Sequence, residues 1–303
     1  MRIIADTTDF KILRPTAVAI GKFDGLHKGH RELLGQVLQT KSKGLLCTIF
    51  TFDPPPEVLF GKRQAKEITT KEEKRIIFEK MGVDILIEYP LNEISAAIEP
   101  ETFVKEVLKE KMNMSYLVAG YDLSFGHKGA GNAELLRKLA PKFDFELNII
   151  EKVCEDGREI SSTFIREEVE AGNMQQVTRL LGEPYMIIGQ VVHGAKLGRK
   201  IGMPTINLLP EKEKMLPPKG VYYSRTQIGD KEYKSITNIG EKPTVSNAKQ
   251  IGAETYLYEF EQDVYGKNAI VKLLEFKRPE QKFTDLDELK VQMLKDINDG
   301  REY

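Results

Sequence analysis

GKFDGLHKGH, at residues 21–30, follows the short apolar run Thr16–Ile20 and precedes a helical pattern. The run has the length and composition of a buried strand. Apolar side chains then recur with the spacing of one helix face, at Leu33, Leu34, Val37 and Leu38. Because a helix N-terminus carries free N–H groups and the positive end of the helix dipole, this strand-to-helix turn predicts an anion site.

The turn itself supplies candidate ligands for nucleotide phosphates. The candidates are Gly21, Phe23, Asp24, His27, Gly29 and His30. The imidazoles can donate hydrogen bonds to phosphate oxygens, and glycine lets a phosphate approach the backbone. Asp24 either belongs to the site or only ties the turn together. An ordinary turn with two exposed histidines is the alternative for the whole stretch.

The alternation of apolar runs and helical patterns before residue 183 predicts a mostly parallel sheet with helices on both faces. The predicted strands lie at 16–21, 45–52, 84–89, 116–119 and 147–153, and helical patterns at 71–81 and 100–112. Beyond residue 183, short strand candidates separated by Gly, Pro, Asn and Asp predict a small antiparallel β-barrel with a helix over 285–297. We therefore expect an α/β domain at 1–183 and an all-β domain at 184–303.

Composition excludes several other classes of protein. The 45 basic and 46 acidic side chains nearly cancel, and charge runs such as KEEKR at 71–75 mix both signs. We expect no nucleic-acid partner, because such proteins usually show a basic stripe. Cys47 and Cys154 make no CxxC pair, so neither a disulfide framework nor a zinc site is expected. With no apparent secretory signal or apolar membrane span, we expect a cytoplasmic protein.

The HxGH turn resembles the signature of the nucleotidyltransferase superfamily, and its GxFDGxHxGH form resembles bacterial bifunctional riboflavin kinase/FAD synthetases. The resemblance implies a Rossmann-like first domain in which the phosphate of FMN attacks the α-phosphorus of ATP. His27 and His30 would hold the α-phosphate as charge builds on its oxygens. Asp122, in the glycine-rich loop that ends at residue 132, is a candidate for binding the flavin.

ISSTFIR, at residues 160–166, matches the second signature of the superfamily. The resemblance places Ser161, Ser162, Thr163 and Arg166 on the β- and γ-phosphates, with Mg²⁺ bridging them. Capping of the helix by these hydroxyls is the alternative.

Three positions depart from the family pattern in this half. Pro55 replaces the histidine of FxPHP, and Leu123 and Gly129 replace the phenylalanine and arginine of GxDFxFGxxRxG. A lost hydrogen bond to a charged group costs about 1.5–3 kcal/mol, so adenylyl transfer is expected to be weaker or aimed at another acceptor. The substitutions Pro55→His and Gly129→Arg, which restore the family residues, are expected to raise it.

In the second half, GQVVHGAKLGRKIGMPTINL at 189–208 resembles the GRxxGxPTxN signature of riboflavin kinase. Thr205 and Asn207 alternate on an extended segment, so both side chains point to one face and can reach a shared Mg²⁺ and nucleotide phosphate. Gly194, Gly198 and Gly202 form a loop that can close over phosphates with its backbone N–H groups. A barrel hairpin with surface Thr and Asn is the alternative.

Four further stretches follow in family order: GVYYS at 220–224, TNIGEKPT at 237–244, ETYLYEFEQDVYGK at 254–267 and FKRPEQKF at 276–283. The resemblance makes Glu254 the general base, since the primary alcohol that attacks the γ-phosphate must lose its proton. Asn238 and Arg278 are candidates for positioning the flavin or for the barrel's own hydrogen bonds.

Together these patterns predict an enzyme that makes FMN from riboflavin and FAD from FMN, using ATP and Mg²⁺. Its partners are then small molecules, with no membrane partner, and a homo-oligomer is possible. Three other interpretations stay open: a riboflavin kinase whose first domain is impaired or takes another acceptor, a flavin-binding sensor without turnover, and a single-acceptor cytidylyl or adenylyl transferase with an appended barrel. The PTIN segment at 204–207 argues against the third.

Overall fold

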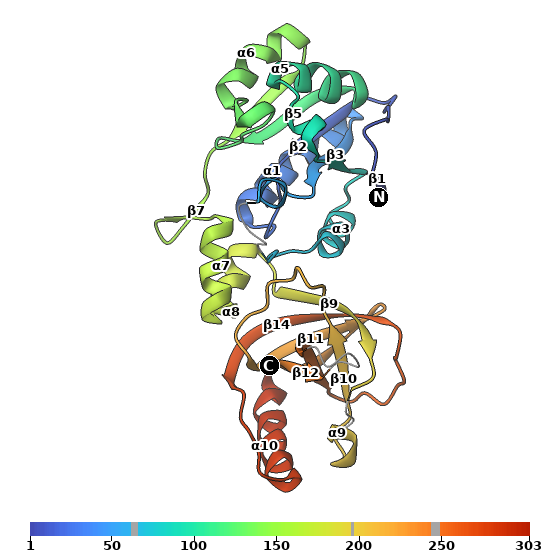
Figure 1. Cartoon of the computed structure of the whole chain (residues 1–303), viewed down its shortest axis with the longest axis vertical. Helices are drawn as coiled ribbons and strands as arrows, with labels where there is room; N and C mark the ends of the chain where they lie inside the picture. Colours follow the sequence, from blue (N-terminus) through green and yellow to red (C-terminus); the bar gives the residue numbers. More distant parts are fainter. Residues whose placement is uncertain (62–65, 195–196, 244–248) are drawn as a thin grey trace. The chain divides into compact units, whose positions relative to one another are not determined.

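The computed structural model describes residues 1–61, 66–194, 197–243 and 249–303 (Figure 1). The described chain divides into two compact units. The first contains Met1–Ala65 and Lys74–Ser161, and the second contains Lys66–Glu73 and Ser162–Tyr303. The predicted boundary at 183/184 stays a prediction.

The first unit is built on a six-stranded parallel sheet with strand order β1-β4-β3-β2-β5-β6. The strands are β1 (Arg2–Ala5), β2 (Thr16–Ile20), β3 (Leu46–Asp53), β4 (Ile85–Pro90), β5 (Met114–Gly120) and β6 (Glu146–Ile150). All five residues of β2 are buried, as expected for a central strand covered on both faces. A two-stranded hairpin, β7 (Cys154–Glu155) and β8 (Arg158–Glu159), follows β6.

Helices flank this sheet. Helix α1 (Lys28–Gln39) packs against β2, β3 and β5 through Leu33, Leu34 and Val37. A π-helix at Phe103–Lys111 and helix α6 (Ala133–Phe143) join a core cluster that also contains Val18 and Ile20. The remaining helices are α2 (Pro56–Leu59), α3 (Lys71–Lys80), α4 (Glu93–Ala96), α5 (Pro100–Thr102) and 3₁₀ turns at Thr40–Lys43 and His127–Gly129.

Strand β2 is the point at which the strand order reverses. From β2, the chain proceeds through β3 to β4 on one side and later returns to β5 on the other. Ligands of open parallel sheets bind in the crevice beyond the carboxyl ends of the two strands at such a switch point. The 21–30 turn leaves β2 there, and the loop that contains Asp122 leaves β5.

The second unit contains a closed antiparallel barrel with strand order β10-β13-β12-β11-β14-β9. The strands are β9 (Tyr185–Val192), β10 (Thr205–Leu209), β11 (Gly220–Ile228), β12 (Lys231–Pro243), β13 (Lys249–Leu257) and β14 (Asn268–Pro279). Helices α7 (Ser162–Ala171), α8 (Met174–Leu181), α9 (Leu197–Lys200) and α10 (Leu286–Asp299) and a 3₁₀ turn at Gly300–Glu302 belong to the same unit. Helix α8 packs on β9 and β14.

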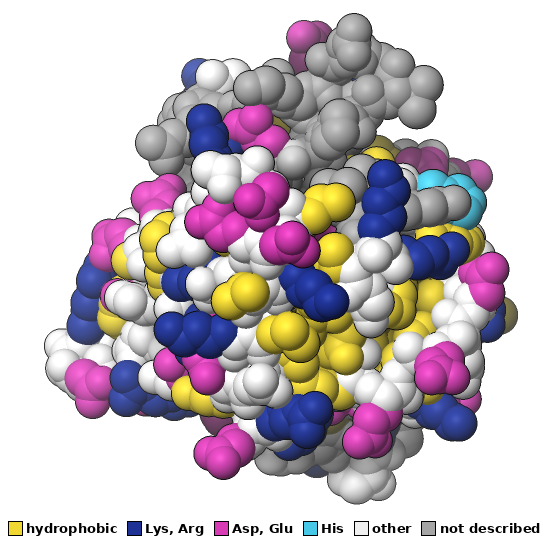
Figure 2. Space-filling view, turned by 90° about the horizontal axis from the view of Figure 1, so that it is seen from below, with side chains coloured by type: hydrophobic (Ala, Val, Ile, Leu, Met, Phe, Trp, Pro, Cys, Tyr) yellow, Lys and Arg dark blue, Asp and Glu magenta, His cyan; other side chains and the backbone are white. Residues whose placement is uncertain are grey.

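The two faces of the barrel strands have different chemistry. A chain of hydrogen-bonded hydroxyls crosses the buried face, through Thr226, Ser235, Ser224, Thr237 and Thr255. The opposite face packs against α10 in a cluster that includes Val221, Tyr223, Ile236 and Ile297. Figure 2, which views the molecule from below, shows hydrophobic side chains gathered on one face among Lys and Arg side chains. Because the hydroxyls of the buried face bond to one another, the outer face is the surface on which polar site residues can meet a ligand.

Segment 66–73 is bonded into the second unit. Glu67 exchanges backbone hydrogen bonds with Glu213 and Met215, at 2.6 and 2.8 Å. The Lys214 ammonium donates to Glu73 Oε2 at 2.7 Å and to the Ile68 carbonyl at 2.6 Å, and both charged side chains are 1% exposed. Breaking such a buried pair by removing one partner typically costs about 3–5 kcal/mol, because the other charge stays buried.

The predicted fold class is confirmed: a parallel sheet with flanking helices is followed by a small antiparallel barrel and a C-terminal helix. The predicted strands of the first unit shift by a few residues at their ends, as at β5, predicted at 116–119 and found at Met114–Gly120. Strand β1 and the β7–β8 hairpin had no sequence prediction, since four-residue and two-residue strands give no measurable periodicity.

Candidate active sites

The turn after β2 holds its two histidines face to face. His27 caps α1, its Nδ1 accepting from the His30 backbone N–H at 3.3 Å, and the two rings stack with centroids 3.8 Å apart. Gly29 gives the His27 ring room, because a Cβ at that position would lie 3.2 Å from the ring, closer than most side chains pack. Phe23 is fully buried with a left-handed φ of 52° and packs edge-on against Phe78. The turn therefore packs the two imidazoles against each other, with the His30 ring also against Phe23.

The hydrogen bonds of the turn assign opposite tautomers to the two neutral imidazoles. His27 Nδ1 accepts a bond, so its proton lies on Nε2. His30 Nδ1 lies 3.4 Å from the Gly25 carbonyl, an acceptor only, so its proton lies on Nδ1. His27 Nε2 is thus a donor for an anion in the neutral state, whereas His30 Nε2 becomes a donor when the ring gains a proton.

Both imidazoles are held neutral. Burial lowers the pKa of His27 to about 4, against the opposing field of the carboxylates of Asp122, Asp24 and Glu159. Burial also holds the pKa of His30 well below its usual range, and the neighbouring His27 acts in the same direction. A bound phosphate would raise both values, because a nearby negative charge favours imidazolium.

The three departures from the family pattern lie in different local environments. Leu123 packs against the core cluster of the first unit. Pro55 precedes α2 and stands at its N-cap. Gly129 has a φ of 69°, and a Cβ there would clash with the Ser124 hydroxyl, which donates to the Gly129 carbonyl at 2.9 Å. The expectation that Gly129→Arg would restore a donor therefore meets a steric obstacle that the sequence did not reveal.

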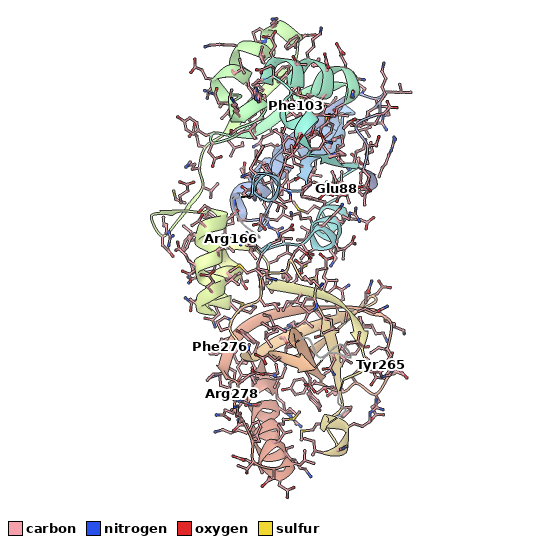
Figure 3. All side chains as sticks on the ribbon, viewed as in Figure 1. Glu88, Phe103, Arg166, Tyr265, Phe276 and Arg278 are labelled. Atoms are coloured by element: carbon pink, nitrogen blue, oxygen red, sulfur yellow. The ribbon has the colours of Figure 1, made fainter. Side chains whose placement is uncertain are left out.

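The hydroxyl cluster of ISSTFIR falls where the two units meet in the sequence. Ser161 is the last residue of the first unit, whereas Ser162 and Thr163 open α7 in the second. Arg166, labelled in Figure 3, donates to the Lys66 carbonyl at 2.5 Å. The role of these four residues with His27 and His30 stays a prediction.

In the second unit, three predicted site residues form one row across neighbouring strands. Asn207 of β10 and Asn238 of β12 both pair directly with Glu254 of β13. The Thr205 hydroxyl donates to Glu254 Oε1 at 2.8 Å. Paired antiparallel residues have Cβ atoms about 4.5–5.5 Å apart, so one small ligand can reach all three positions. The barrel thus brings together residues separated by up to 49 positions in the chain.

The glycine loop before Thr205 is fitted to this row. A Cβ at Gly194 would clash with the Asn207 amide, and one at Gly198 would clash with the Met203 carbonyl. Gly202 has a φ of 79°. These glycines therefore permit close packing as well as a turn. Residues 195, 196 and 244, within the motif stretches, lie outside the described residues.

Arg278 is tied to helix α10. Its guanidinium donates to both carboxylate oxygens of Asp296, with Nη2–Oδ2 at 2.6 Å, and Gln292 donates to Oδ1 of the same carboxylate (Figure 3). The sequence left two roles open for Arg278, positioning the flavin or making hydrogen bonds within the barrel domain. The contact with Asp296 supports the second role. The sequence missed Asp296 because a charged residue in an amphipathic helix gives no signal of burial.

Tyr265 is a further residue the sequence did not single out. Its ring lies against that of His193, with centroids 3.8 Å apart, and its hydroxyl accepts from Arg199 at 3.4 Å (Figure 3). His193 precedes Gly194, so this contact joins the β13–β14 connection to the start of the glycine loop.

The fold and the two sites define a protein of two compact units, with a histidine-bearing turn at the switch point of a parallel sheet in the first and a carboxylate–amide row on a barrel in the second. The FAD synthetase family model matches residues 9–164, and the riboflavin kinase family model matches residues 181–303. The chain belongs to the family of bifunctional riboflavin kinase/FMN adenylyltransferases.

Named members of that family align over nearly the whole chain. The proteins from Listeria monocytogenes, Bacillus subtilis and Escherichia coli K12 are 34%, 33% and 35% identical. The alignments cover 94%, 95% and 94% of this chain and 91%, 92% and 92% of those proteins.

A solved structure from Streptococcus pneumoniae, described as a macrolide-efflux protein, is similar over 99% of this chain and 98% of its own, with a TM-score of 0.87 and 30% identity. In this chain, none of the helices within the described residues has the length and apolar character needed to cross a membrane.

Proposed function

We propose that this protein phosphorylates riboflavin to FMN in its second unit and adenylylates FMN to FAD in its first, with ATP as the co-substrate of both reactions. The observation that carries the proposal is the row on the barrel, in which Glu254 lies directly between Asn207 and Asn238 and accepts a hydrogen bond from Thr205. Family membership over the whole chain supports both activities.

For the kinase reaction, the Glu254 carboxylate is the proton acceptor. The primary alcohol of riboflavin would bind within hydrogen-bond reach of Glu254 and lose its proton as it attacks the γ-phosphate. Thr205 orients the carboxylate through the 2.8 Å bond to Oε1. Asn207 and Asn238, on either side of Glu254, would hold the phosphate and the alcohol in line.

The donor set on β10 suits Mg²⁺. Thr205 directs its hydrogen to Glu254, so the lone pairs of its oxygen are available to a cation, and Asn207 adds an amide oxygen. Mg²⁺ prefers oxygen ligands and usually binds through few protein groups together with substrate phosphates. When bound, it would neutralise charge on the transferring phosphoryl group.

For the adenylyl transfer, the imidazoles of the HxGH turn stabilise charge. His27 Nε2–H would donate to the α-phosphate, and a phosphate-induced proton on His30 would add a second donor at its Nε2. The attacking phosphate of FMN is already an anion, so positioning and neutralisation are the main contributions of the protein. Ser161, Ser162, Thr163 and Arg166 are proposed for the outgoing pyrophosphate.

An alternative is a riboflavin kinase whose first unit is impaired or takes another acceptor. Pro55 and Gly129 favour this alternative, since each position lacks the donor that the family pattern carries.

One time course separates these functions. Purified protein is incubated with riboflavin, ATP and Mg²⁺, and FMN and FAD are quantified separately by chromatography. We expect FMN to appear first and FAD to follow. FMN without FAD, also when FMN is supplied directly, would establish the alternative. Absence of both FMN and FAD would refute the kinase assignment.

A further inference from the structure

We propose that Glu280, Gly240 and Asn238 form a subsite that binds the hydroxyl-bearing side chain of the flavin, a polyol, beside Glu254. The inference deepens the proposed kinase function and rests on it. It assigns a substrate-positioning role to Glu280 and a steric role to Gly240.

The first observation is a pair of facing glycines on the barrel, where neither strand carries a side chain of its own. Gly240 of β12 pairs directly with Gly252 of β13. Each lies two residues from the site row, Gly240 after Asn238 and Gly252 before Glu254, so both glycines share the face of that row. Glycine inside a strand weakens the strand and commonly marks a place where a ligand or another backbone approaches closely.

The second observation is the position of the Glu280 carboxylate. Its Oε1 accepts from Asn238 Nδ2 at 3.2 Å, and an added Cβ at Gly240 would clash with the same oxygen. Glu280 therefore lies over Gly240, next to the amide that pairs with the proposed base. The residue is exposed, so its carboxylate can be reached by a solute.

Arg278, two residues earlier, cannot fill this role without losing its own partner. Its guanidinium is bound on two sides to Asp296. Within FKRPEQKF, Glu280 is thus the charged group directed toward Asn238, whereas Arg278 is directed toward α10.

The chemistry of the three groups fits a chain of hydroxyls. A carboxylate accepts hydrogen bonds from alcohols, and a carboxamide both donates and accepts. Residues two apart on a strand are separated by about 7 Å, the scale of a short polyol. With its terminal hydroxyl at Glu254, such a chain would pass Asn238 and place its inner hydroxyls at Glu280. A bulkier residue than glycine at 240 would obstruct that path.

Binding measurements with two ligands test the subsite. Riboflavin carries the hydroxyl chain, whereas lumiflavin has the same ring system with a methyl group instead. Dissociation constants are measured by fluorescence titration for the unmodified chain, Glu280→Ala, Gly240→Ala and the control Glu261→Ala. Glu261 is exposed and lies beyond the other end of β13. Thermal unfolding checks that each variant is folded.

We expect Glu280→Ala to weaken riboflavin binding by roughly 10- to 100-fold, because hydrogen bonds to a charged group are lost. Gly240→Ala should weaken it as well, because the added methyl group displaces the Glu280 carboxylate and obstructs the path of the hydroxyl chain. Lumiflavin binding should be unchanged in both variants, and Glu261→Ala should bind both ligands as the parent does. Equal loss of affinity for both ligands, or no loss for either, would overturn the subsite. An unmodified chain that binds riboflavin through this subsite but makes no FMN would instead refute the kinase function alone.

Discussion

The two candidate sites differ in the charge that they offer to a phosphate or an alcohol. The first unit offers buried, neutral imidazoles at the end of a parallel strand, and their charge would develop only with an anion bound. The second offers a carboxylate hydrogen-bonded to a hydroxyl on the outer face of a barrel. The difference follows from the nucleophile: a phosphate needs neutralisation, whereas an alcohol needs a proton acceptor.

The strongest test of this contrast is Glu254→Gln. The change keeps the size of the side chain but removes the proton acceptor, so FMN formation should fall by roughly 10²- to 10⁴-fold. Conversion of supplied FMN to FAD should stay at the parental rate. Both rates are measured by chromatography, with Glu261→Gln as the control. Near-parental FMN formation by a folded Glu254→Gln protein would leave this carboxylate only a positioning role.

The converse test is His30→Ala. We expect FAD formation to fall by roughly 10²- to 10³-fold, the usual cost of removing one donor to a charged transition state. FMN formation should be unaffected. His127→Ala is the matched control, since its side chain is 40% exposed and pairs with Glu99 outside the turn. A similar loss of both activities would point to misfolding, or, in a variant shown to be folded, would contradict separate sites.

The substitution Gly129→Arg tests whether the guanidinium of the family pattern can be restored in the first site. The φ of 69° and the Ser124 hydroxyl oppose a side chain here, so we expect a loss of stability of roughly 1–2 kcal/mol. Adenylyl transfer should not rise. Chemical denaturation measures the first effect and an FMN-to-FAD assay the second. A stable, more active variant would show that the loop tolerates the family residue.

The smallest expected effect concerns pH. Because the folded pKa of His27 is depressed to about 4 from 6.5, the unfolded chain binds more protons between these values. The contribution of the neutral His27 imidazole to the free energy of unfolding is complete above pH 6.5 and is lost as the pH falls toward 4. From pH 7 to 5.5, His27 alone should lower the free energy of unfolding by about 1 kcal/mol. His27→Asn should reduce the pH dependence of the free energy of unfolding in denaturation curves, with the contribution of His30 remaining, and His127→Asn should leave it unchanged. An unchanged slope in His27→Asn would contradict a buried neutral imidazole.

Much of the architecture could be predicted from local sequence. Strand β2 is a five-residue apolar run, α1 repeats its apolar residues on one face, and turn residues separate the barrel strands, so periodicity alone indicates both layers. The motifs also located the residues that the barrel brings into one row, because extended alternation places Thr205 and Asn207 on the same face.

Other features depended on contacts between distant residues. The sequence by itself determined which side chains are available, the imidazoles of the turn and the oxygens of the PTIN segment. Only the tertiary structure decided the protonation states and partners of these side chains. Burial keeps His27 and His30 neutral, and strand register places Glu254 between two asparagines. Asp296 binds the Arg278 guanidinium. Local patterns carry no information on desolvation or register, since both arise when segments far apart in the chain pack together.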